Sequence, residues 1–249
     1  MPLEDEFTEV MRSIADMPKL LYFRGILPEK RTKTVAIVGA RKMTTYGQEV
    51  AYDLAFALAR RGVVVVSGLA YGIDGVAHRA CLDAGGITVA VLGTRIDHLY
   101  PRGHVRLAEE IIRTGVILSE YGPEDAVLPR ASFVLRNRIV SGLADEVIVV
   151  EAAEGSGTLT TAELAVKQGR KLWAVPGNVG QPMSEGCNRL IAEGKARMAT
   201  SVTEVVEEIC GEKQEELVLS DRKDLRCERG SQLDGRASLV QRTLEEIGL

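Results

Sequence analysis

Short apolar runs and amphipathic stretches alternate along most of this chain. Six runs rich in valine and isoleucine, starting near residue 34, read TVAIVG, VVVVSG, ITVAVLG, GVILSEYG, EVIVVEA and KLWAVPG. None alternates apolar with polar positions, which is typical of strands buried on both faces of a parallel sheet. Helical spacing of apolar residues fills the intervals at 46–61, 73–84, 104–114 and 158–168. The pattern predicts an α/β fold, with a mostly parallel, doubly wound sheet and helices on both faces.

The same pattern divides the chain into three parts. We expect the α/β domain to span residues 34–210. Residues 1–33 hold a short helical pattern and then PKLLYFRGILPEKRTKT, which we expect to be a strand or strap leading into the core. Residues 211–236 are polar and predict a linker, and residues 238–249 are long enough for one short helix but not for a further domain.

Composition narrows the class of protein. The chain has 249 residues, of which 45% are hydrophobic and 27% charged, as in ordinary globular domains. No apolar run approaches the roughly 20 residues that span a bilayer, and the acidic start MPLEDEFTEVM does not resemble a signal peptide. The cysteines (Cys81, Cys187, Cys210 and Cys227) are far apart and form no CxxC pair. We therefore expect a cytoplasmic protein with no metal site and no membrane association.

Charge is unevenly distributed along the sequence. The formal net charge is −4, but the segment from Glu204 to the end holds 12 acidic and 7 basic residues. The preceding 203 residues then hold 24 basic and 23 acidic residues, so the main domain is close to neutral. Because binding of a polyanion depends on the local field and not on total charge, a basic groove is compatible with this composition.

Glycine-rich turns follow three of the predicted strands, at the sheet edge where ligands of open α/β folds bind. Glycine allows close approach of the backbone, and the start of the next helix offers free N–H groups and a positive dipole end. Such turns also occur simply as tight connections, but three of them together with the phosphate-binding chemistry of an arginine favour an anion site. The turns contain Gly39, Ala40 and Arg41; Ser67, Gly68, Leu69, Ala70, Tyr71 and Gly72; and Gly155, Ser156, Gly157 and Thr158.

These turns do not have the spacing of the common nucleotide-binding loops. The chain contains no GxxxxGK(S/T) sequence, and the turn at Gly39 lacks the later glycines of a dinucleotide-binding fingerprint. We therefore expect no nucleotide cofactor.

A basic segment with one aromatic residue forms a second candidate site. If the chain is helical from residue 133 to residue 143, Phe133 and Asn137 are i,i+4 neighbours, while Arg136 and Arg138 splay to either side. Arg130 then lies just before the first turn. Cations for phosphates and a ring for base stacking are the requirements of a single-strand site. The alternative is a solvated basic helix with Phe133 in the core.

Other polar residues carry weaker signals. Asp74 and His78 are i,i+4 neighbours, a spacing that suits an acid–base pair but more often a structural contact or a helix cap. His98 and His104 have no carboxylate cluster beside them, so neither predicts a metal site. Glu163 follows a glycine-rich turn, as in some hydrolases of N-glycosidic bonds, or it is simply a surface residue of a helix.

Read in order, the motifs of this chain resemble those of the DprA/Smf family of DNA-processing proteins. The resemblance rests on VAIVGAR, SGLAYGIDGVAH, LYP, SEYG, FVLRNRIVSGLADEVIVVEA, SGTLTTAELAVKQGRKLWAVPG and GCNRLIAEG, and it covers roughly residues 18–210. It implies an extended Rossmann-like domain that binds single-stranded DNA and is not an enzyme. It also implies protection of incoming strands in natural transformation, loading of a RecA-type recombinase onto them, and a homodimer.

The resemblance also implies roles for particular residues. Arg41, Ser67, Gly68 and Gly157 would line a phosphate pocket, with Thr158 beside it. Arg130 would lie near a stacking aromatic residue, Phe133. Arg136, Asn137 and Arg138 match the RNR element of the family.

This sequence departs from the family pattern at several points. Val134 stands where proline is frequent, Arg95 where glycine is common, and His104 where asparagine is common. An N-terminal SAM-type domain and a C-terminal winged helix, found in many members, have no room here, so functions that depend on them are not implied.

Three other functions are compatible with the same residues. A nucleotide N-glycosidase of the LOG phosphoribohydrolase type has a PGGxGTxxE stretch, and Glu163 falls two positions late for it. A sensor could hold a small nucleotide in the same pocket. A purely structural or partner-docking protein would bind neither ligand.

Overall fold

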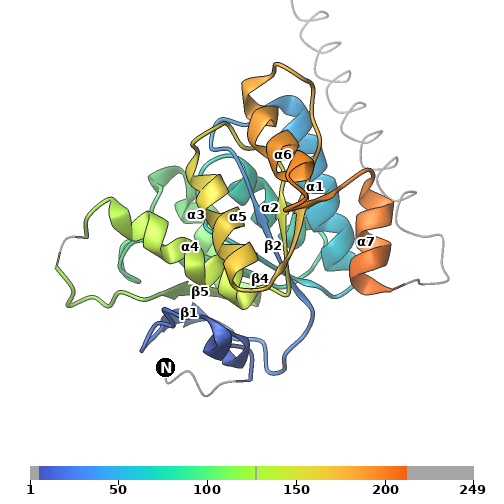
Figure 1. The fold of residues 1–249 in the computed structure, drawn as a ribbon. Coiled ribbons are helices and arrows are strands. Elements are labelled where there is room, and N and C mark those ends of the chain that lie inside the picture. Colours follow the sequence, from blue (N-terminus) through green and yellow to red (C-terminus); the bar gives the residue numbers. More distant parts are fainter. Residues whose placement is uncertain (1–5, 127, 212–249) are drawn as a thin grey trace, which may run out of the picture. The chain divides into compact units, whose positions relative to one another are not determined.

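The computed structural model describes residues 6–126 and 128–211 of the chain (Figure 1). The predicted linker beyond Gly211 and the predicted helix at 238–249 lie outside these residues. The described part contains a sheet of eight strands in the order β1-β5-β4-β3-β2-β6-β7-β8. Six neighbouring pairs are parallel, and β1 pairs antiparallel with β5. The predicted fold class, a mostly parallel α/β sheet, is confirmed.

All six predicted strands form where the apolar runs occur. Each is short and buried over nearly its whole length, which explains the lack of alternation in the sequence. The central strands are β2 (Thr34–Val38), β3 (Val64–Ser67), β4 (Thr88–Leu92), β5 (Val116–Ser119), β6 (Glu146–Val149) and β7 (Lys171–Ala174). At the two edges lie β1 (Tyr22–Gly25) and β8 (Arg197–Met198).

The helices cover both faces of the sheet. The predicted helices are present as α1 (Thr45–Arg60), α2 (Ile73–Asp83), α3 (Val105–Thr114), α4 (Ala131–Leu143) and α5 (Gly157–Lys167). The described residues also form α6 (Pro182–Ala192) and α7 (Val202–Cys210), which the apolar pattern did not predict, and two 3-10 helices, η1 (Glu9–Ser13) and η2 (Arg102–His104). Figure 1 shows α4 and α5 side by side in front of the sheet, with α1 and α2 behind.

Alternate residues of β4 and β5 belong to two separate hydrophobic clusters. In β4, Val89 and Val91 belong to the cluster under α4, α5 and α6, whereas Ala90 and Leu92 belong to the cluster under α3. This division follows from the two-residue repeat of a strand, which points successive side chains to opposite faces. No described helix is long and apolar enough to cross a bilayer.

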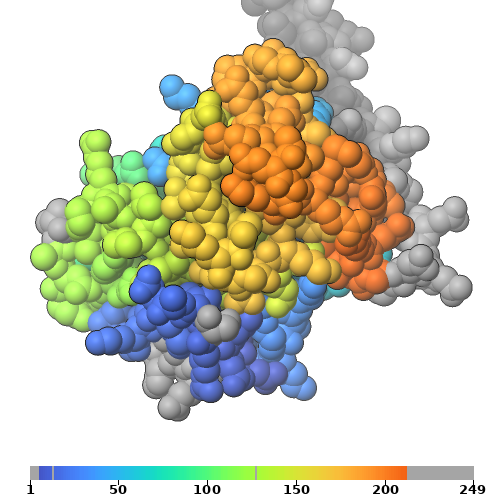
Figure 2. All heavy atoms as spheres, viewed as in Figure 1, coloured from blue at the N-terminus to red at the C-terminus, as the bar shows by residue number. Residues whose placement is uncertain are grey.

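The N-terminal segment packs along the lower edge of the sheet, below α4 (Figures 1 and 2). Phe7 and Met11 are fully buried, although the helical pattern of this region yields only the 3-10 helix η1. Further along, the predicted strand or strap contains β1, whose Phe23 lies opposite Leu118 of β5. The boundary between this segment and the main domain stays a prediction.

A buried carboxylate joins the start of β6 to two neighbours. Glu146 is 2% exposed, and its two oxygens accept hydrogen bonds from Lys33 Nζ and Trp173 Nε1, both at 2.8 Å. We expect Trp173→Phe to lower the free energy of unfolding by about 1–3 kcal/mol, because one buried carboxylate oxygen loses its donor. Urea denaturation measures the change.

The control is Arg189→Ala, which removes an exposed ion pair with Glu154. Exposed pairs contribute about 1 kcal/mol or less, so this variant should stay close to the parent protein. Equal stability of the Trp173→Phe variant and the parent would contradict the role assigned to Glu146.

Candidate nucleic-acid interface

A pocket opens at the point where the strand order of the sheet reverses. From β2 the chain proceeds through β3, β4 and β5 in one direction, and then returns to place β6 and β7 on the other side. Ligands of open α/β sheets bind beyond the carboxyl ends of the strands at such a switch point. The pocket has a volume of about 440 Å³. Its lining includes Gly39, Ala40, Arg41, Lys42, Gly68, Asp74, Phe133, Arg136, Asn137, Ser156, Gly157, Thr158, Thr161 and Met183.

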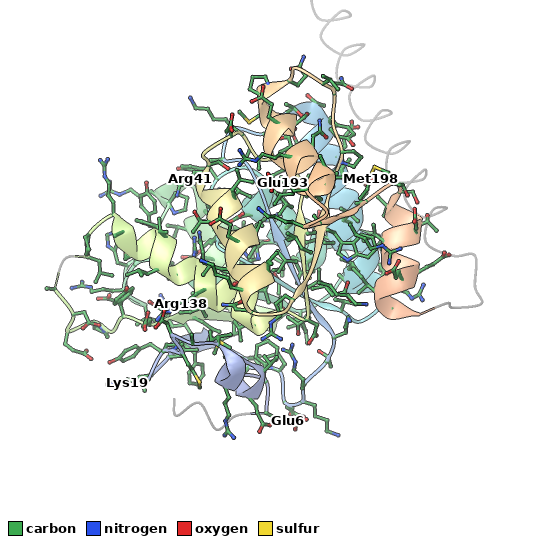
Figure 3. All side chains as sticks on the ribbon, in the orientation of Figure 1. Glu6, Lys19, Arg41, Arg138, Glu193 and Met198 are labelled. Carbon is green, nitrogen blue, oxygen red and sulfur yellow. The ribbon has the colours of Figure 1, made fainter. Side chains whose placement is uncertain are left out.

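The turn after β2 forms one side of the pocket. It is pressed against the turn after β3: Gly72 has a φ of +79°, and a Cβ there would clash with the carbonyl oxygen of Ala40. Only glycine combines this backbone conformation with so close an approach. As a result Arg41 and Lys42 are exposed beside the pocket, and neither side chain has a hydrogen bond or ion pair within the described residues. Figure 3 labels Arg41 above α5.

The position of this turn is fixed from the neighbouring strand β6. Glu151, which is 4% exposed, accepts a hydrogen bond from Thr44 N at 3.0 Å and one from Thr44 Oγ1 at 2.5 Å. Thr44 Oγ1 in turn accepts from Gly47 N and so caps the start of α1. The buried glutamate therefore has a structural role in holding Arg41 and Lys42 at the switch point.

The turn after β3 has most of its polar groups committed to the protein. Ser67 is fully buried and donates its hydroxyl to the carbonyl oxygen of Ile37 at 2.6 Å. Asp74 Oδ2 accepts from the N–H groups of Gly68 and Ala70 at 3.1 and 3.3 Å. Burial raises the pKa of Asp74, and the charge of Arg136 opposes that shift. Gly68 lines the pocket, but its N–H group is already bonded, and Ser67 is not part of the lining.

Helix α4 brings three of the predicted residues to the pocket: Phe133, Arg136 and Asn137. It begins at Ala131, with Arg130 at the N-cap, and Phe133 and Asn137 lie one turn apart on the side that faces the pocket. Phe133 is half-buried, so its ring is neither in the core nor free in solvent. Asn137 Nδ2 donates to the carbonyl oxygen of Gly157 at 3.4 Å, which connects α4 to α5 across the pocket.

The three basic residues of this segment have different surroundings. Arg136 is 5% exposed and donates to the carbonyl oxygens of Gly68, at 2.6 Å, and Val91. Burial lowers the pKa of Arg136 to about 10. Arg138 pairs with Glu120 at 2.6 Å and lies near the N-terminal segment, well away from Arg41 (Figure 3). Arg130 is exposed and has no hydrogen bond or ion pair of its side chain among the described residues, but it does not line the pocket.

The start of α5 closes the pocket on its far side. Gly155 has a φ of +69°, and Ser156 is the N-cap of the helix. Ser156 Oγ is buried without a hydrogen-bond partner within the described residues. A Cβ on Gly157 would meet only open space. The first N–H groups of a helix have no partners within the helix, so this terminus offers donors to an anion.

Sequence reasoning did not select every residue of the site. Lys42 was missed, although its position directly after Arg41 is a usable signal. Glu163 is exposed on α5 and does not line the pocket. Asp74 and His78 do not bond to each other. Instead, Asp74 accepts a hydrogen bond from a backbone N–H group of the turn after β3, and His78 Nδ1 lies 2.7 Å from Thr88 Oγ1.

The fold and the pocket define a class: a Rossmann-like α/β protein with a pocket at its switch point that is bordered by exposed cations. The sequence profile of the DNA recombination-mediator protein A family matches residues 1–210, and the chain belongs to that family. The resemblance found in the motifs is thus confirmed.

Individual relatives agree with this assignment. The chain is 40% identical over 210 residues to protein Smf of Escherichia coli K12, covering 84% of this chain and 56% of that protein. It is 41% identical over 206 residues to DNA processing protein DprA of Streptococcus pneumoniae R6, covering 83% and 72%. The chain thus spans little more than half of the Escherichia coli relative.

Solved structures show the same fold. DNA processing protein A from Streptococcus pneumoniae matches with a TM-score of 0.73 at 40% identity, over 80% of this chain and 69% of that one. DNA processing protein A from Helicobacter pylori matches with a TM-score of 0.73 at 32% identity, over 81% and 91%. A molybdenum cofactor binding protein from Rippkaea orientalis, at 20% identity and a TM-score of 0.54, shares the fold alone.

The buried His78 predicts a pH dependence of stability. Burial lowers its pKa from 6.5 to about 3, so between these values the unfolded chain binds a proton that the folded protein does not. Folding stability must therefore fall as the pH falls below 6.5. Relative to a His78→Gln variant, the parent should lose about 1.4 kcal/mol of unfolding free energy per pH unit between pH 6 and pH 4.

Urea denaturation at several pH values measures this difference directly. The variant is the appropriate reference because all other titrating groups, including Asp74, are present in both proteins. Parallel stability curves for the two proteins would contradict the low pKa of His78.

Proposed function

We propose that this protein binds single-stranded DNA in the switch-point pocket. The observation that carries the proposal is the combination of groups around that pocket: two exposed cations that have no partner among the residues the structure describes, the free start of a helix, and a half-buried aromatic ring. Phosphates would bind Arg41, Lys42 and the N–H groups at Gly157 and Thr158. One base would stack on Phe133. The mode of binding single-stranded DNA is the subject of the solved Helicobacter pylori structure, and this relationship supports the proposal.

The same chemistry gives the expected selectivity. A ring accepts any base, so binding should tolerate sequence, and phosphate contacts should make the affinity fall with salt. Duplex should bind less well, because paired bases cannot reach a ring at the wall of a pocket. Asn137 would position the strand between α4 and α5, and Arg130, near the mouth of the pocket by its place in α4, would meet an adjoining phosphate.

Arg136 and Arg138 have structural roles in this proposal. Arg136 lines the pocket, but its guanidinium bonds two carbonyl oxygens, so it contributes positive potential and not a free phosphate ligand. Arg138 is paired with Glu120 and lies outside the pocket. Ser67 and Gly68 likewise shape the turn after β3.

On the basis of family membership, we further propose a role in DNA processing during transformation, with homodimers that load a RecA-type recombinase in the cytoplasm. Dimerisation would bring two switch-point pockets together and increase the affinity for strands long enough to reach both.

A nucleotide N-glycosidase is less well supported by the geometry. Such an enzyme needs a free carboxylate at the pocket, but Glu163 does not line the pocket and Asp74 already accepts hydrogen bonds from two backbone N–H groups. The first experiment is fluorescence anisotropy with a labelled single strand and a duplex control over a salt series. Equal affinity for strand and duplex, or no binding at low salt, would overturn the proposal.

Arg41→Ala tests the phosphate contact. Loss of one phosphate ligand should weaken binding of every sequence and lower the slope of log affinity against log salt by about one. Arg60→Ala is the matched control, because Arg60 is also exposed but lies at the opposite end of α1. An unchanged slope in Arg41→Ala would remove Arg41 from the phosphate site.

Phe133→Leu tests the stacking contact. Leucine keeps much of the packing against Gly93, where a Cβ would lie 2.7 Å from the Phe133 ring, but removes the aromatic face. We expect a loss of about 1–3 kcal/mol in binding free energy at an unchanged salt slope. Phe133→Tyr should retain binding. Full affinity in Phe133→Leu would show that no base stacks on this ring.

A further inference from the structure

Two exposed tyrosines continue outward from Phe133 along the carboxyl edge of the sheet. Tyr100 lies on the loop after β4 and is 46% exposed, and Tyr71 lies on the turn after β3 and is 48% exposed. Only 4% of the chain is aromatic. Single exposed apolar residues need no explanation, but neighbouring aromatic residues beside a basic pocket are typical of an interaction site.

Tyr100 is in ring contact with Phe133, and one short turn links Tyr100 to Tyr71. The centroids of Phe133 and Tyr100 are 5.4 Å apart, with the planes inclined at 56°. Tyr100 begins the turn that contains η2, and Gly103 N of that turn donates to Tyr71 Oη at 3.3 Å. Tyr71 also packs edge-on to His104, with centroids 5.0 Å apart. The short turn from Tyr100 to His104 therefore connects the two tyrosines.

Hydrogen bonds and close packing of His104 hold this turn in place. His104 Nδ1 lies 2.9 Å from the carbonyl oxygen of Leu69, and His104 N donates to that of Pro101 at 2.9 Å. Gly75 passes so close that a Cβ on it would lie 2.5 Å from the His104 ring. Rings supported in this way lose little freedom when a base stacks on them.

Positive charge accompanies the two tyrosines. Arg102 begins η2, in the turn that links the two tyrosines, and Arg106 follows about one helical turn later. Both are exposed, and the described part of the chain gives neither a hydrogen bond nor an ion pair. A cationic track beside stacking rings is the arrangement that binds single strands without sequence preference.

We propose that Tyr100 and Tyr71 form a second base-stacking surface, which takes the nucleotides that leave the pocket beyond Phe133 while Arg102 contacts their phosphates. The proposal rests on the function proposed above and adds the direction of the strand's path. It concerns residues outside the pocket itself, since neither tyrosine is part of the pocket lining.

The test is a series of strands from a dinucleotide to about 20 nucleotides, bound to the full chain and to Tyr71→Leu and Tyr100→Leu variants. A dinucleotide fills the pocket alone, so the variants should bind it as the parent does. Longer strands should bind each variant about 5- to 150-fold more weakly, the range of one base–aromatic stack. Tyr71→Phe should bind like the parent. Phe23→Leu is the matched control, since Phe23 is 45% exposed but lies on β1.

Long strands with abasic positions beyond the pocket separate stacking from phosphate binding. Their affinity should not respond to the tyrosine substitutions, because the bases that would stack are absent. Arg102→Ala, at an exposed residue without a partner, should lower the salt slope for long strands by about one, and this holds even if a tyrosine variant fails to fold.

The outcomes distinguish the second stacking surface from single-strand binding in the pocket. Suppose that the parent binds single strands and that Arg41→Ala weakens this binding. If the tyrosine and Arg102 variants then bind strands of every length as the parent does, the proposed second stacking surface is overturned. Equal losses with intact and abasic strands also overturn it. If the parent binds no strand, the proposed function itself fails.

Discussion

The geometry of the pocket depends on one buried guanidinium. Arg136 is nearly inaccessible to solvent, yet its donors bond the carbonyl oxygens of Gly68 and Val91, at the ends of β3 and β4. Burial lowers its pKa only to about 10, so the group stays charged at neutral pH beside the buried Asp74. A carbonyl left without a donor in such a place is costly, so α4 has one favourable position against the strand ends. That position directs Phe133 and Asn137 into the pocket.

Most of the fold could be predicted from the sequence because its central strands are buried on both faces. Runs such as VVVVSG have no polar face to turn toward solvent, so they indicate strands covered on both sides. The segments between them have apolar residues at helical spacing. The periphery was harder to predict. Strand β8 has only two residues and pairs with β7, and α6 packs against the same strand, so the sequence alone carries little signal for either. Helix α7 has a usable signal that was missed, since Ser201 caps Glu204 N and Val205, Val206 and Ile209 are buried at helical spacing. The helical pattern near Glu9 yields a 3-10 helix, since tertiary contacts of Phe7 and Met11 and not propensity decide its form.

The candidate site was predictable in its location but not in the role of each residue. Successive residues of an α-helix point about 100° apart, so the adjacent Arg136, Asn137 and Arg138 have different surroundings. Arg136 is buried at the wall of the pocket and Asn137 faces the pocket, whereas Arg138 pairs with Glu120 outside it. Sequence spacing reveals this separation, but not which direction faces the ligand. Likewise, the glycine-rich turn after β3 suggested free N–H groups, and the structure shows that Asp74 already accepts two of them.

Charge and aromatic rings would contribute to binding at this surface in different ways. The first 203 residues are nearly neutral and Arg136 at the pocket is already bonded within the protein, so a small set of exposed cations without partners among the described residues would release counterions from a polyanion. The affinity from these contacts would fall with salt. Stacking on exposed rings would add affinity that salt does not screen, and only unpaired bases can supply it. A surface built in this way would discriminate against duplex, because stacking requires bases that are free to turn outward.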